Sequence, residues 1–162
     1  MLLLWCAMGF AALAQVPQST AVAPPDFSGK WTIDKSRTNI RSNLSNITDH
    51  LLTIEHREPE IRFSTHYKRK NKDVNSELVY YTDGRPGIDP RVAIGDPPPK
   101  TMWQDNKLVR ILTTAPKGPF RVQAETREEW VMSADRETLT RITTSSLRDT
   151  VLSTRTVFLR VH

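Results

Sequence analysis

Short segments in which apolar and polar residues alternate with period two constrain this chain more than any other feature. The clearest pair is 50–57 and 60–69, where a two-residue turn at Glu58-Pro59 places Ile54 opposite Phe63. This register gathers apolar side chains on one face and polar side chains on the other, as in half-buried antiparallel strands. The two segments therefore predict a β-hairpin with one face in a core.

The same alternation recurs along most of the chain, and no segment has a convincing helical period. A turn at Asp105-Asn106 suits a tight hairpin and sets Trp103 opposite Leu108. Further strands are expected at 29–33, 76–82, 101–104, 107–114, 121–132, 138–144 and 150–161. This pattern predicts an all-β fold, an antiparallel up-and-down barrel of about eight to nine strands.

The stretch 83–100 interrupts the strand pattern because it is rich in glycine and proline, including the run Pro97-Pro98-Pro99. Such a composition is incompatible with regular ladder pairing and predicts a long loop. Long loops in compact domains are usually lids, binding loops or disordered segments. We expect this loop to gate the barrel and to tolerate shortening, because closure entropy changes slowly with loop length.

The N-terminal residues 1–14 are uncharged and apolar and end in Ala12-Leu13-Ala14, a small-x-small pattern typical of a secretory signal peptide. The run lacks a basic n-region, which favours a start upstream of Met1, and a short apolar anchor is the alternative. Residues 15–25 are aperiodic and rich in proline, which predicts a flexible linker. The folded domain is therefore expected at 26–162.

Cleavage after Ala14 would remove Cys6, the only cysteine, so the mature domain must rest on its hydrophobic core. We expect a periplasmic or extracellular location and no transmembrane span in the mature chain. The formal net charge of +5 favours contact with an anionic envelope surface. Nucleic acid is not an expected partner, because it fits poorly with secretion.

The step Gly29-Lys30-Trp31 opens the first expected strand. Gly29 suits a backbone that bends tightly at a barrel floor. Trp31 then points inward two residues later, because the side-chain period of a strand is two. The pair therefore predicts a floor that closes one end of the barrel.

Five stretches of the chain carry a resemblance to a known group: they are Phe27–Ser36, Tyr81–Gly84, Trp103–Val109, Glu129–Asp135 and Leu139–Thr140. Together they resemble lipocalin-like, calycin-type secreted bacterial β-barrel proteins of unknown function. In lipocalins and their barrel relatives, a basic side chain from the last strand covers the tryptophan of the Gly-x-Trp step. The resemblance therefore implies that Arg155 or Arg160 covers Trp31.

Strand parity directs a set of large side chains into the barrel, where they are candidates for ligand binding. The aromatic members are Phe63, Tyr67, Tyr80, Trp103 and Trp130. Glu128 is also directed inward, and a buried carboxylate needs a partner or a shifted pKa. An ion pair with Arg110 or Arg141 is one interpretation, and a ligand-orienting or acid–base role is the other.

Three functions remain open at this point. The first is a secreted binding protein that holds a small apolar or amphipathic ligand in the barrel. The second is an envelope structural or interaction protein with a filled barrel and a basic surface. The third is a barrel enzyme that uses Glu128, although no Ser-His-Asp arrangement, phosphate loop or nucleophilic cysteine accompanies it, so no catalytic residue is predicted.

Metal and cofactor sites are not predicted either. His50, His56 and His66 lie on neighbouring expected strands, but the register directs His56 inward and His66 outward. No carboxylates accompany them at ligand spacing. The three histidines are therefore interpreted as surface and rim residues.

Overall fold

The computed structural model describes residues 23–39, 46–117 and 122–162. Within these residues it has nine strands: β1 (Gly29–Ile33), β2 (Ile47–Arg57), β3 (Glu60–Arg69), β4 (Lys72–Tyr81), β5 (Lys100–Gln104), β6 (Lys107–Lys117), β7 (Val122–Met132), β8 (Thr138–Leu147) and β9 (Thr150–Val161). They form one sheet in the order β4-β3-β2-β1-β9-β8-β7-β6-β5, and the strands that pair are antiparallel. The predicted all-β, antiparallel up-and-down fold class is confirmed.

The hairpin registers follow from the alternation and the turns. Ile54 lies opposite Phe63, as predicted, and the pairing of β3 with β4 carries the same inward face on to Leu78. Trp103 lies opposite Leu108, also as predicted. Because each two-residue turn fixes its register, local sequence places these side chains correctly on one face.

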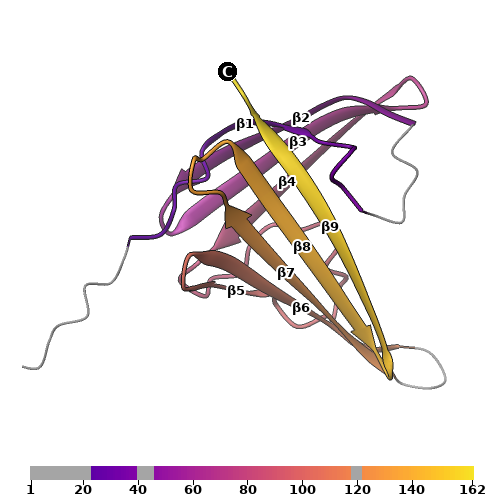
Figure 1. Ribbon diagram of the computed structural model, residues 1–162. Coiled ribbons are helices and arrows are strands. Elements are labelled where there is room, and N and C mark those ends of the chain that lie inside the picture. The colour runs from indigo at the N-terminus through magenta and orange to yellow at the C-terminus, as the bar shows by residue number, and fades with distance from the viewer. Residues whose placement is uncertain (1–22, 40–45, 118–121) are drawn as a thin grey trace, which may run out of the picture.

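The pairing of β1 with both β2 and β9 joins the two halves of the chain into one curled sheet. Figure 1 shows β2, β3 and β4 arching over one side of the interior, while β6 to β9 form the other side. The two ends of the strand order are β4 and β5. The barrel is therefore open along a seam between these strands.

Residues 82–99 connect the strands on either side of this seam. Ile88 and Val79 of β4 exchange backbone hydrogen bonds of 2.8 and 2.9 Å. Gly87 makes this approach possible, since a Cβ atom there would lie 1.9 Å from the Val79 carbonyl oxygen. This bridge holds the segment against the sheet edge and brings Asp89, the next residue, to the barrel interior.

One end of the barrel contains the predicted floor. Trp31 is fully buried, and its indole N–H donates a hydrogen bond of 3.1 Å to the carbonyl oxygen of Phe27. Arg160 from β9 lies with its guanidinium 4.3 Å from the centre of the Trp31 ring. Arg155 is exposed and pairs through its backbone with Asn39. Of the two arginines considered for the floor, Arg160 thus covers the tryptophan.

Gly29 lies directly beneath this arginine. Its φ of 140° falls in a region that side chains disfavour, and a Cβ atom would lie 2.6 Å from Nη1 of Arg160. Glycine is therefore required here both by the backbone and by the side chain that crosses it.

The predicted signal peptide at 1–14, most of the linker at 15–25 and the first residue of the strand expected at 121–132 lie outside the described residues. In the part of the chain that is described, no helix is long and apolar enough to cross a bilayer.

Candidate functional site

An interior pocket with a volume of about 300 Å³ lies inside the curled sheet. Its lining is mostly apolar and comes from both halves of the sheet: Ile33, Ile47, His50, Leu52, Phe63, Thr65, Tyr67, Ser76, Leu78, Pro90, Arg91, Trp130, Arg141, Thr156 and Phe158. A volume of this size holds about ten water molecules and lies at the small end of the range for ligand pockets.

The mouth of the pocket is marked by its exposed lining residues. Ser76 on β4, with Pro90 and Arg91 from the segment 82–99, are exposed to solvent. The pocket therefore reaches solvent along the open seam, where the segment 82–99 borders it.

Trp130 on β7 forms the aromatic wall of the pocket. It is 2% exposed, and its ring lies 4.9 Å from that of Phe63 and 5.9 Å from that of Phe158, measured between centroids. Tyr67 stacks on His50 at 6.2 Å further along the pocket. These rings supply a large apolar surface in fixed positions, as ligand pockets commonly do.

A buried cluster of ion pairs adjoins the pocket. Arg91 donates hydrogen bonds of 2.7 Å to Asp89 and 2.6 Å to Glu128, and Arg110 donates one to Asp89. The Tyr80 hydroxyl donates a hydrogen bond of 3.1 Å to Glu128, and its ring packs under the Arg110 guanidinium. The side chains of Asp89, Arg110 and Glu128 are each 1% exposed, whereas that of Arg91 is 42% exposed.

These contacts keep both carboxylates ionised. Burial by itself would raise the pKa of Glu128, but the hydrogen bond from Arg91 and the charges of Arg91, Arg141 and Arg110 outweigh it and lower that pKa. The pKa of Asp89 is lowered in the same way, because hydrogen bonds from Arg91 outweigh burial. Burial and the Glu128 charge raise the pKa of Tyr80, so its hydroxyl remains a donor.

Arg141 on β8 faces Trp130 across the strand pair, with its guanidinium 5.3 Å from the indole ring. Among the described residues, no carboxylate oxygen lies within 4.0 Å of its guanidinium nitrogens. Its only hydrogen bond in that set is a long one of 3.5 Å to the Thr156 hydroxyl. Arg141 is thus a cation at the pocket wall that has no ion-pair partner within residues 23–39, 46–117 and 122–162.

Three buried side-chain nitrogens in the described part of the chain lack a hydrogen-bond partner: His50 Nδ1, Trp130 Nε1 and Arg141 Nε. All three residues line the pocket. Native proteins leave few buried polar atoms unpaired, because each costs free energy. The wall of this pocket therefore contains the buried nitrogens of the described residues whose hydrogen bonds are unsatisfied.

His50 contributes a neutral ring to this wall. Burial lowers its pKa most, and the nearby charges of Arg141 and Lys35 lower it further. The imidazole therefore adds hydrogen-bonding capacity to the pocket at neutral pH without adding charge.

The predicted ligand-binding residues separate into three places. Phe63, Tyr67 and Trp130 line the pocket. Tyr80 and Glu128 belong to the ion-pair cluster beside it. Trp103 lies at the floor of the barrel.

Trp103 packs its ring 5.4 Å from that of Phe27 and 5.8 Å from that of His56. Its indole N–H donates a hydrogen bond of 2.7 Å to Glu58, which also bonds His56 at 2.9 Å. Trp103 therefore shares the inward face predicted for it but helps to close the floor.

The alternation pattern could not identify Asp89 and Arg91, because they lie in a loop without periodicity. A weak signal was present in the sequence. Strand parity directs Arg110 and Arg141 inward against one inward carboxylate, Glu128, which indicates that another acidic group must approach the interior. It does not indicate which acidic residue does so.

Comparison of the chain with protein-family models, curated proteins and solved structures found no match. The resemblance to lipocalin-like proteins therefore remains a prediction from the sequence. The site has to be interpreted from its own geometry.

The histidines lie apart. His56 is beside Glu58 at the floor, His66 bonds Asn75 on the outer face, and His50 is in the pocket wall. Across residues 23–39, 46–117 and 122–162, no cluster of three or more histidine, cysteine or acidic side chains could hold a metal ion.

Proposed function

We propose that this chain is a secreted, lipocalin-like binding protein that holds a small apolar or amphipathic molecule inside its sheet. The observation that supports this most is the pocket of about 300 Å³, whose lining combines four aromatic rings with aliphatic side chains and a few polar groups. That composition is typical of ligand pockets. The exposed mouth at Pro90 and Arg91 gives the segment 82–99 a place from which to gate entry.

Secretion to the periplasm or beyond is part of the proposal. Its support is the apolar run 1–14 with the Ala12-Leu13-Ala14 pattern. A domain without cysteine, stabilised by an apolar core, suits that location.

An acid–base role for Glu128 has weaker support. The carboxylate bonds Arg91 and Tyr80, and its lowered pKa makes it a poor proton donor at neutral pH. The same contacts favour its interpretation as part of a structural ion pair.

Ligand binding can be tested by titrating the protein with fatty acids, isoprenoids and aromatic metabolites while recording tryptophan fluorescence. Trp130 lies in the pocket wall, so an occupying ligand should change its emission saturably. A Thr65→Phe variant should abolish the change, because residue 65 lines the pocket and the larger ring would fill it.

The matched control is Ser64→Phe, at the exposed neighbouring position on the same strand. It should leave the fluorescence change intact. Urea unfolding of both variants verifies that they fold. Absence of a saturable change across the whole panel in the unmodified protein would refute the binding function.

A further inference from the structure

We propose that the pocket selects amphipathic molecules carrying a carboxylate, and that Arg141 and Trp130 bind that carboxylate. The inference rests on the proposed binding function and names the chemical class of its ligand.

The first observation is the donor set at the pocket wall. Trp130 is 2% exposed, and its indole N–H has no acceptor among the described residues. Nε of Arg141, across the strand pair, likewise has none. The N–H groups of an indole and of a guanidinium can donate hydrogen bonds but cannot accept them. Both nitrogens can therefore be satisfied only by an acceptor, which favours a ligand with a carboxylate end over one with an ammonium end.

The second observation is the charge of the interior. The buried members of the cluster are the carboxylates of Asp89 and Glu128 and the guanidinium of Arg110, and Arg91, whose side chain is 42% exposed, supplies the second cation. The ion pairs of the cluster involve Arg91 and Arg110, and none of the described residues forms an ion pair with Arg141. An anionic ligand group would supply an ion-pair partner for Arg141, and a carboxylate matches the planar fork of an arginine.

The third observation is that the donors and the apolar walls belong to the same pocket. Trp130 and Arg141 line it together with Leu52, Leu78 and Phe158. A molecule with a carboxylate at one end and a hydrocarbon body can therefore satisfy both kinds of surface at once. A fully polar anion would leave the apolar walls without a partner.

Glu128 does not reverse this preference, although it is the acidic side chain that strand parity directs inward. It is 1% exposed and already accepts hydrogen bonds from Arg91 and Tyr80. Its charge is therefore neutralised within the protein.

The inference can be tested by isothermal titration calorimetry of the full chain at neutral pH with decanoate, decanol and decylamine. These probes share a hydrocarbon body and differ in the charge of the polar end. Decanoate should bind about tenfold or more tightly than decanol, because a hydrogen bond to a charged group is worth more than one to a neutral group. Decylamine should bind most weakly.

The Arg141→Gln variant should lose about tenfold in affinity for decanoate and keep its affinity for decanol. Trp130→Phe, which retains a ring without the N–H, should show the same selectivity with a smaller loss. The control is Arg155→Gln, because Arg155 is exposed on the neighbouring strand. This control should change neither affinity.

The outcomes separate the two proposals. If none of the three probes binds, the binding function itself fails and the inference fails with it. If decanol or decylamine binds as tightly as decanoate, the binding function stands and the carboxylate inference is overturned. The carboxylate inference would also be overturned if Arg141→Gln and Trp130→Phe each lowered the affinity for all three probes equally. Equal losses of affinity would show that these side chains only shape the pocket.

Discussion

Replacing Glu128 with glutamine tests the buried ion-pair cluster most directly. Glutamine has nearly the same shape and retains a carbonyl oxygen that can accept the hydrogen bond from Arg91, which is 2.6 Å long in the unmodified protein. Packing is therefore almost unchanged, and the substitution removes a charge. It leaves one carboxylate, Asp89, beside the guanidinium groups of Arg91 and Arg110.

The magnitude follows from the burial of the partners. Removing one member of a buried ion pair typically costs 3–5 kcal/mol, because the remaining charge is left uncompensated. The Glu128 side chain is 1% exposed, but that of Arg91 is 42% exposed, so solvent screens part of the loss. We therefore expect Glu128→Gln to lower the free energy of unfolding by about 3 kcal/mol.

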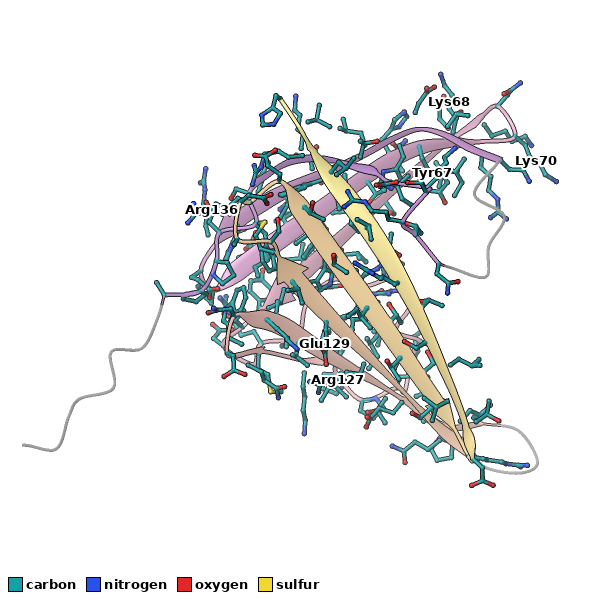
Figure 2. All side chains as sticks on the ribbon, viewed as in Figure 1. Tyr67, Lys68, Lys70, Arg127, Glu129 and Arg136 are labelled. Carbon is teal, nitrogen blue, oxygen red and sulfur yellow. The ribbon has the colours of Figure 1, made fainter. Side chains whose placement is uncertain are left out.

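The assay is urea unfolding, with Glu129→Gln as the matched control. Figure 2 labels Glu129 and Arg127 on the same strand, β7, and the two side chains form an ion pair of 2.8 Å. Lys107 approaches Glu129 at 3.5 Å, and its side chain is 49% exposed. The control should therefore lose less than about 1 kcal/mol. A loss in Glu128→Gln no larger than that of the control would refute the reasoning.

Three further predictions follow from the same structure. Because the pKa of Glu128 is lower in the folded state than its ordinary value of 4.5, its ion pair stabilises the protein above that pH, and the stabilisation is lost as the pH falls through the folded value. Between pH 7 and pH 3, the free energy of unfolding should therefore fall less steeply in Glu128→Gln than in the unmodified protein. Trp31→Ala should cost about 3 to 5 kcal/mol in urea unfolding, as expected for a fully buried aromatic residue, and a loss under about 1 kcal/mol would contradict its place in the floor. Gly87→Ala should separate the segment 82–99 from β4 and speed amide hydrogen exchange at Val79 and Ile88, because its Cβ would meet a backbone carbonyl. Gly84→Ala is the control for backbone strain alone: its φ of 86° disfavours alanine, but nothing lies within 4 Å of the added atom, so those two amides should stay protected.

The structure limits the tolerance to shortening that the composition of residues 83–100 predicted. Glycine and proline content predicted a loop that tolerates shortening. The structure places Asp89 of this segment against Arg110 and Arg91 against Glu128. Deletion of residues 87–91 would leave buried charges without partners, so we expect tolerance only for deletions that spare those five positions.

The sequence by itself determined the strands and their registers. Period-two alternation and two-residue turns are local features, and they predicted the pairs Ile54 with Phe63 and Trp103 with Leu108. Parity also directed Glu128 and Trp130 inward, because each strand position has only two possible faces.

Only the tertiary structure decided how these inward residues are grouped. Trp103 and Trp130 share a face, yet one closes the floor and the other lines the pocket, because position along the barrel depends on how all nine strands of the described chain are staggered. The pairing of β1 with β9 and the docking of Asp89 at the interior join residues far apart in the sequence. Such contacts depend on how the whole sheet curls and on the compensation of buried charge. A local sequence pattern contains neither kind of information.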